Sequence, residues 1–196
     1  MGEIIVETKP SNISWDAIAN LLAESHKDNI KRGFTQNSSH MKGSEIEKKV
    51  SNGMCFIAKD GETVVGTLSV IPRKKANWYC NKGALYCMLA GVSPKYKGKG
   101  VYSLLAHARD EYARKMGFPV VYLYTPIKNR RMQKAAKKDG FIPVSFSVST
   151  DTTYYSVIMA KWLNGCPFNQ FYCLFKYFYS QFYIRLNFKV GAIKRF

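Results

Sequence analysis

The chain has 196 residues, of which 46% are hydrophobic, and its 30 Lys and Arg outweigh 13 Asp and Glu to give a formal net charge of +17. This length suits one domain with a substantial core, and the charge calls for an anionic partner: a phosphorylated cofactor, a nucleic acid or a membrane surface. The start lacks a signal-peptide pattern and no stretch is apolar enough to span a bilayer, so we expect a cytoplasmic protein. The five cysteines show no CxxC or Cys/His spacing, which predicts reduced thiols and no structural metal.

The first half of the chain predicts a strand, two helices and a hairpin before a buried strand. The segment "SWDAIANLLAESHKD" (14–28) opens on Ser14 as N-cap and repeats apolar residues at helical spacing. The turn Asp60-Gly61 lies between two β-runs in 54–72, which is a strong hairpin pattern. The other elements expected here are strands over 3–8 and 83–93, a brief helix over 45–52 and a long polar loop over 29–44.

The second half predicts two helices that alternate with strands. Residues 98–116 form a predicted helix whose Leu104, Leu105, Ala108 and Tyr112 share one face. The other elements expected are a strand over 119–125, a basic helix over 129–140 ended by Gly140, and a closing β-pair in "FIPVSFSVS" and "TYYSVIMAKWL". This mixture of strands and helices predicts an α/β fold.

A basic, glycine-rich loop precedes the helix predicted at 98–116. The loop "SPKYKGKG" combines three lysines with two glycines: Lys95, Lys97, Lys99, Gly98 and Gly100. Glycines let a ligand approach the backbone, and the start of a helix presents unpaired N–H groups and a partial positive charge. The segment therefore predicts an anion-binding cradle. It fits neither the Walker pattern nor the dinucleotide fingerprint, which needs a third glycine where Ser103 stands.

This element order and loop resemble the GNAT superfamily of N-acetyltransferases. The family pattern is Gln or Arg, two residues, Gly, one residue, then Gly or Ala, and "KYKGKG" (95–100) matches it with lysine in first place. The preceding "GVSPKY" is similar to the family's Val-x-Pro segment, and "NRRMQKAAKKDGF" (129–141) to its Asn, Ala-rich, Gly-Phe block. The resemblance implies a GNAT domain over 1–163, with a mixed, mostly antiparallel twisted sheet flanked by helices. A C-terminal helical extension is expected over 164–196.

The resemblance further implies acetyl-CoA as cosubstrate and a primary amine as acceptor, which reacts by direct attack in a ternary complex. The pyrophosphate would bind N–H groups of the glycine loop, and the pantetheine arm would pair with "MLAGV" (88–92) if that strand splays from "VYLYT" (121–125). Asn129 would bond the pantetheine or line the thiol's exit, although a helix N-cap explains this residue equally well. The expected cofactor-binding residues are Ala90, Gly91, Val92, Lys97, Gly98, Lys99, Gly100, Val101, Tyr102 and Asn129.

Two catalytic residues that are frequent in the family are missing here. The strand before the loop, "GALYCMLAGV", has no carboxylate to serve as the base, and Ala136 stands where the family often has a general-acid Tyr. The substitutes that we consider are Tyr86 near the expected base position, Tyr154 or Tyr155 from a nearby strand, and His40 from the long loop. The alternative is catalysis by positioning, with a proton path through water.

The C-terminal extension is aromatic and basic and holds no acidic residue. Its aromatic and apolar residues recur at helical spacing: Phe168, Phe171, Tyr172, Phe175, Phe178 or Tyr179, Phe182 and Leu186. We expect this stripe to be covered by the protein's own domain in the first place, by the second subunit of a homodimer in the second, and by an anionic membrane surface in the third. Such a tail is similar to that of enzymes encoded among bacterial polysaccharide-assembly genes, which suggests an amino sugar or a sugar nucleotide as acceptor.

Two other classes of function stay open at the level of sequence. A nucleic-acid-binding module would explain the basic and aromatic composition, although no nucleic-acid motif is recognisable. A non-catalytic acyl-CoA-binding or peripheral membrane protein on the same scaffold would explain the missing Glu and Tyr. If the protein is an enzyme, the loop 29–44 and the segment 73–83 are expected to flank the thioester, and Arg73, Lys74 and Lys75 would suit a phosphorylated acceptor.

Overall fold

The computed structural model describes residues 3–33, 37–74, 83–148, 155–166, 168 and 170–189. Its strands are β1 (Ile4–Thr8), β2 (Met54–Asp60), β3 (Thr63–Arg73), β4 (Ala84–Val92), β5 (Val120–Pro126), β6 (Ile142–Val148) and β7 (Tyr155–Trp162). Its α-helices are α1 (Trp15–Lys31), α2 (Gly43–Val50), α3 (Val101–Lys115), α4 (Arg130–Lys138) and α5 (Gln170–Lys189). Short 3-10 helices span Asn37–Ser39 and Pro94–Tyr96.

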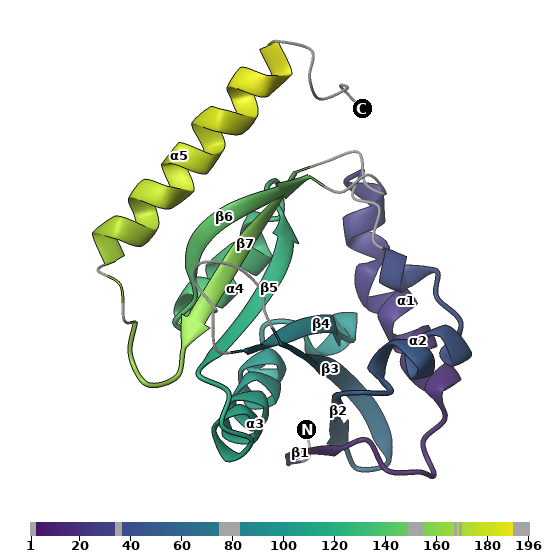
Figure 1. Ribbon diagram of the computed structural model, residues 1–196. Helices are drawn as coiled ribbons and strands as arrows, with labels where there is room; N and C mark the ends of the chain where they lie inside the picture. Colours follow the sequence, from purple (N-terminus) through teal and green to yellow (C-terminus); the bar gives the residue numbers. More distant parts are fainter. Residues whose placement is uncertain are drawn as a thin grey trace.

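The strands form one sheet in the order β1-β2-β3-β4-β5-β7-β6 (Figure 1). Among the described pairings, β4 and β5 run parallel and the other neighbours run antiparallel. Helix α3 makes the crossover that a parallel pair requires. The predicted mixed, mostly antiparallel sheet is therefore confirmed.

Helices cover both faces of this sheet. Ile18 and Leu22 of α1 and Ile46 of α2 pack in one buried cluster with residues of β2 and β4. Leu105 of α3 and Ala136 of α4 belong to a second cluster with other residues of β4 and with β5. Because successive side chains of a strand point to opposite faces, β4 contributes to both clusters and is covered on both sides.

The predicted hairpin forms between β2 and β3. Asp60 pairs with Thr63, so the two-residue turn consists of Gly61 and Glu62. Gly61 has a φ of 58°, which a residue with a Cβ adopts at a cost. The turn lies one residue later than Asp60-Gly61, and the prediction of the hairpin is confirmed.

The core face predicted for α3 is partly wrong. Leu104 is 44% exposed, whereas the charged residues Arg109 and Asp110 are buried. Apolar periodicity misses such a face because two buried charges interrupt the hydrophobic pattern. Their burial requires partners elsewhere in the fold.

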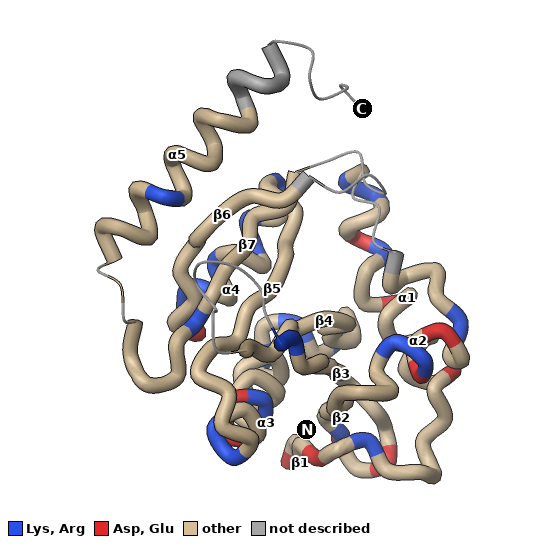
Figure 2. The backbone as a smooth tube through the Cα atoms, in the orientation of Figure 1, with Lys and Arg blue, Asp and Glu red and all other residues tan. Residues whose placement is uncertain are grey.

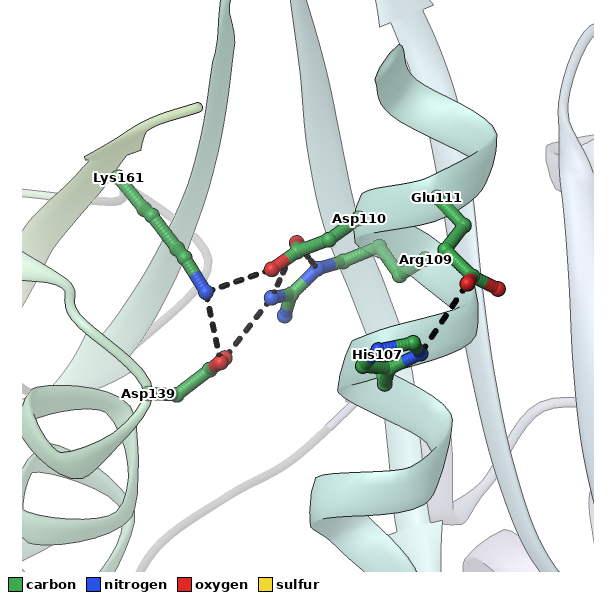
Figure 3. A network of polar contacts seen from close by, with 6 residues as sticks. All are labelled: His107, Arg109, Asp110, Glu111, Asp139 and Lys161. Atoms are coloured by element: carbon green, nitrogen blue, oxygen red, sulfur yellow. Dashed lines mark hydrogen bonds and ion pairs between the residues drawn. The ribbon is translucent and has the colours of Figure 1, made fainter. Parts of the chain in front are cut away.

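Asp139 and Lys161 provide those partners, so that four charged side chains form a network between α3, α4 and β7 (Figure 3). The Arg109 guanidinium donates to one Asp110 oxygen at 2.6 and 2.8 Å and to Asp139 at 2.8 Å. The Lys161 ammonium donates to Asp110 at 2.5 Å and to Asp139 at 2.9 Å. Two cations thus alternate with two carboxylates, and the network ties α3 to the C-terminal end of α4 and to β7.

Helix α5 packs along the edge strand β6 (Figure 1). The rings of Phe146 and Tyr177 stack with centroids 4.6 Å apart, the Ser145 and Ser180 hydroxyl oxygens are 3.4 Å apart, and Cys173 is buried. Within the described residues, no helix has both the length and the apolar character needed to cross a membrane.

The aromatic stripe predicted for this helix does not face the domain. Phe171, Phe175, Phe178 and Phe182 are 59% to 79% exposed. Our first expectation, that the protein's own domain covers the stripe, is therefore wrong for these residues. Aromatic residues occur all around α5, so helical spacing alone does not reveal which side packs on β6.

Candidate functional site

Strands β4 and β5 separate part of the way along their length. Their pairing runs from Leu85↔Val121 to Cys87↔Leu123, although β4 continues to Val92. The register between β3 and β4 shifts at the same point, and Leu89 has a φ of 52°. This bulge bends β4, so within the described residues the edge of 88–92 that faces β5 is unpaired. The separation expected for a pantetheine arm, beside Ala90, Gly91 and Val92, is therefore present.

The glycine loop joins this strand end to α3. Gly98 and Gly100 have φ values of 82° and 83°, and a Cβ built on either meets no protein atom within 4 Å. Within the described part of the chain, the N–H groups of Gly98, Gly100, Val101 and Tyr102 donate to no acceptor. These donors lie at or just before a helix N-terminus, and the space beside Gly98 and Gly100 is open, which suits an anion-binding cradle.

The lysines of the loop contribute less to this cradle than their sequence suggests. The Lys97 ammonium donates to the Ser25 carbonyl oxygen at 2.9 Å and lies 3.5 Å from an Asp28 carboxylate oxygen, so its charge is directed to α1. The Lys99 ammonium lies 5.0 Å from the centroid of the Tyr96 ring. The N–H groups of both lysines bond to carbonyls within the loop. The backbone donors after Lys97 therefore form the main part of the cradle.

Helix α1 brings two residues to the loop that sequence reasoning did not select. A Cβ on Gly91 would lie 2.5 Å from Ser25 Oγ, so β4 approaches α1 as closely as a glycine allows. His26 is buried, and burial together with the nearby Lys97 lowers its pKa to about 4. Its ring is therefore neutral at neutral pH. A single histidine on an amphipathic helix carries no sequence signal of this environment.

Asn129 acts as the N-cap of α4. Its side-chain oxygen accepts a hydrogen bond from the Met132 N–H at 3.2 Å, which agrees with the alternative explanation from the sequence. Its own N–H donates to the Pro126 carbonyl at 2.8 Å, so it directly follows the separated end of β5. Capping and a contact with pantetheine are compatible here, because the cap uses the side-chain oxygen and not the amide nitrogen.

Tyr86 lies on β4 just before the separation. Its ring stacks on Tyr122 with centroids 5.2 Å apart and meets Tyr124 edge-on at 5.3 Å. Burial, and then these two tyrosines, raise the pKa of Tyr86 to about 12. The hydroxyl therefore keeps its proton at neutral pH, and it is suited to donate a hydrogen bond rather than to act as a base.

A cavity of about 290 Å³ borders Tyr86. It lies between the end of α2, the end of β3 and the start of β4, and its lining residues are Lys48, Lys49, Ser51, Asn52, Ile71, Pro72, Arg73, Tyr86 and Met88. Three of these side chains are cationic and none is acidic. The cavity therefore favours an anionic group next to the Tyr86 hydroxyl.

The described candidates His40 and Tyr155 do not line this cavity with Tyr86. His40 is exposed and is not among the residues that line this cavity. Tyr154 lies outside the described residues. Tyr155 starts β7, and its carbonyl accepts a hydrogen bond from the Ile127 N–H at 2.8 Å, close to the end of β5. Ala136, where the family often has a Tyr, lies on the buried side of α4 and offers no acid.

Comparison with known protein families matches residues 15–141 to the Acetyltransferase (GNAT) family. The chain belongs to this family. The separated ends of β4 and β5 and the cradle after β4 all lie within the matched residues. Enzymes of the GNAT family use acetyl-CoA as cosubstrate, and the free donors and strand edge described above fit its pyrophosphate and pantetheine parts.

Solved structures support the GNAT fold at low sequence identity. An N-acetyltransferase from Staphylococcus aureus is similar with a TM-score of 0.63 at 14% identity, over 84% of this chain and 100% of that one. An acetyltransferase from Streptococcus agalactiae has a TM-score of 0.62 at 20% identity, over 81% and 98%. A chimeric spermidine N-acetyltransferase from Vibrio cholerae has a TM-score of 0.61 at 14% identity, over 83% and 97%. Among curated proteins, none matches the sequence significantly.

Proposed function

We propose that this GNAT protein transfers an acetyl group from acetyl-CoA to a primary amine by direct attack in a ternary complex. The observation that carries the proposal is the set of N–H groups without an acceptor among the described residues, those of Gly98, Gly100, Val101 and Tyr102, which follows the separated end of β4. Acetyl-CoA needs an anion site next to a strand edge with unpaired peptide groups, because a pyrophosphate adjoins its amide-containing arm. Of the residues proposed from the sequence to bind the cofactor, Ala90, Gly91 and Val92 belong to the strand edge, and Gly98, Gly100, Val101 and Tyr102 belong to the loop.

Tyr86 is the side chain that we place beside the reacting groups. Its raised pKa makes it a hydrogen-bond donor for the departing sulfur. A lysine-like amine with a pKa of ~10.4 costs about 4–5 kcal/mol to deprotonate at neutral pH, so the acceptor also needs a proton path. That path runs through water, with His40 and Tyr154 as further candidates for the proton acceptor.

The acceptor that we propose is an amino sugar that carries phosphate, such as a sugar nucleotide. Lys48, Lys49 and Arg73 around the cavity beside Tyr86 support an anionic acceptor. The same charges disfavour a polycation such as spermidine, on which the similar chimeric enzyme acts by its name. The likeness of the tail to polysaccharide-assembly enzymes points to the same class of acceptor.

The cradle is tested by calorimetry with acetyl-CoA on Gly98→Val and Gly100→Val. Each side chain projects into the open space above the loop, so the affinity should fall at least about tenfold. Both positions have positive φ, so the variants are also strained, and Gly117→Val is the matched control. Gly117 has a φ of 74° and open surroundings at the other end of α3. Equal affinity in all four proteins would exclude the cradle as the cofactor site.

The reaction is tested by thiol release from acetyl-CoA with a panel of primary amines. We expect phosphorylated amino sugars to outperform both neutral amino sugars and polyamines. Arg73→Gln and Lys49→Gln should raise the KM for a phosphorylated acceptor and leave the affinity for acetyl-CoA unchanged, whereas Lys115→Gln on the exposed end of α3 should change neither. Tight binding of acetyl-CoA without thiol release in the presence of any amine would favour a non-catalytic protein on the same scaffold. This is the second candidate function, because the family's Glu is missing and Ala136 replaces its Tyr.

A further inference from the structure

Helix α5 presents a wide apolar surface on the side away from β6. We define its outer face by five residues: Phe171, Leu174, Phe175, Phe178 and Phe182. Their spacing of i, i+3, i+4, i+7 and i+11 places them on one side of a helix. They are between 41% and 79% exposed. Three tyrosines with exposures of 42% to 58% follow along one flank of this face: Tyr172, Tyr179 and Tyr183.

The described contacts between α5 and the domain come from the side of the helix opposite to the outer face. Cys173 and Tyr177, together with Ser180, contact the domain from the opposite side of the helix. With these exposures, the outer face amounts to on the order of 600 Å² of apolar surface, at the upper end of what a monomeric soluble protein shows. A surface of this size and continuity indicates an interaction site.

The charge of this segment indicates which kind of partner it meets. Residues 164–196 contain five Lys and Arg and no Asp or Glu. Figure 2 shows the same on the described part of α5, where a basic residue and no acidic one is drawn. The Lys176 ammonium lies 5.6 Å from the centroid of the Tyr172 ring, at the tyrosine flank. A partner that presents negative charge along an apolar surface is therefore favoured.

A second copy of the chain fits this surface less well. Two helices that pair through a coiled-coil seam bury a narrow stripe, whereas the outer face and the tyrosine flank together span about half the circumference of α5. Each chain also carries a net charge of +17, so two tails with no acidic residue repel each other. A planar anionic surface, in contrast, contacts a wide arc of α5 and attracts the basic residues of the tail.

We infer that α5 binds the surface of an anionic phospholipid bilayer. The phenyl rings of the outer face enter the boundary between headgroups and acyl chains, the tyrosine hydroxyls lie at the level of the headgroups, and the basic residues contact lipid phosphates. The helix lies in the plane of the membrane and does not span it. This inference goes beyond acetyl transfer and does not depend on it.

The test is co-sedimentation of the full chain with vesicles of phosphatidylcholine, with or without phosphatidylglycerol. The wild type should bind the vesicles that contain phosphatidylglycerol and lose this binding as the salt concentration rises. The triple variant Phe175→Gln/Phe178→Gln/Phe182→Gln alters the outer face only, so its partition coefficient should fall at least about tenfold. Ile5→Gln/Met116→Gln is the matched control, because these residues are 59% and 55% exposed elsewhere on the molecule and should leave binding unchanged.

Two results would overturn the inference. The first is a wild type that binds neither kind of vesicle, and the second is a triple variant, shown to be folded by circular dichroism, that binds like the wild type. In the first case, light scattering tests whether the wild type forms a stable dimer that the triple variant converts to a monomer. That outcome would assign the outer face to a second copy of the chain.

Discussion

At the scale of single residues, the buried imidazole of His26 makes the stability of the fold depend on pH. Its pKa is about 4 in the folded chain, against an ordinary value of 6.5, so below pH 6.5 the unfolded chain takes up a proton that the folded chain does not. The contribution is fully present above pH 6.5 and is lost as the pH falls toward 4. Between pH 7 and pH 5 the free energy of unfolding should drop by about 2 kcal/mol from this group.

Urea denaturation of the wild type and His26→Gln at both pH values measures this contribution. The variant removes the titrating group, so the difference between the two proteins should shrink as the pH falls. General acid destabilisation of a basic protein affects both proteins and cancels in the comparison. A difference in stability that stays constant from pH 7 to pH 5 would show that the fold does not lower the pKa of His26.

Tyr86 is the residue whose hydroxyl is expected to matter for the chemical step. Tyr86→Phe keeps the ring and its stacking on Tyr122, and it removes the hydrogen-bond donor. The kcat should fall about 100-fold while the affinity for acetyl-CoA is unchanged. Tyr124→Phe is the control, because this ring belongs to the same cluster but is 39% exposed and does not line the cavity. Equal kcat values for the three proteins would favour catalysis by positioning alone.

At the scale of elements, the ion network between α3, α4 and β7 fixes how the helix after the glycine loop sits on the sheet. Asp110→Ala leaves Arg109 buried with one carboxylate fewer, which should cost about 3–5 kcal/mol of stability. Glu111→Ala changes the next residue of the same helix. Its carboxylate is 65% exposed and lies 3.5 Å from the His107 ring, so this variant should cost less than about 0.5 kcal/mol (Figure 3).

Chemical denaturation of the two variants gives both numbers directly. A similar loss of stability in both variants would mean that the buried network stabilises the fold no more than the exposed pair of Glu111 and His107. If Asp110→Ala weakens acetyl-CoA binding as well, the network also holds the N-terminus of α3 in place for the cradle, because Arg109 lies two turns after it.

At the scale of the whole molecule, the domain over 1–163 and the extension over 164–196 should be separable. The cradle and the separated strands all lie between 84 and 129, so truncation after Leu163 should leave the affinity for acetyl-CoA intact. The truncated protein loses the stacking of Tyr177 on Phe146 and should be less stable by about 2 kcal/mol. Calorimetry and thermal unfolding of the truncated chain check both statements, and a folded truncated protein without cofactor affinity would contradict the boundary.

Much of the fold could be predicted from the sequence. The hairpin and the glycine loop before α3 depend on local features, namely a turn with glycine and glycines before a helix N-terminus, whereas the sheet type was implied by the resemblance to the GNAT family. Each of these acts over a few residues, so a single sequence contains the information. The missing family Glu and Tyr could be recognised in the same way, because they are defined by position in a short motif.

Only the tertiary structure decided which side chains meet across the chain. Three features each join segments that are far apart in sequence: the bulge at Leu89, the ion pair of Asp110 with Lys161, and the direction of Lys97 toward α1. The same holds for α5: the residues at helical spacing were visible in the sequence, but the side that packs on β6 was not. Periodicity defines the faces of a helix, whereas the choice of the buried face depends on the shape of the surface that it meets. In α5 nearly every face is apolar, so the shape of β6 and not the sequence left the phenylalanines exposed.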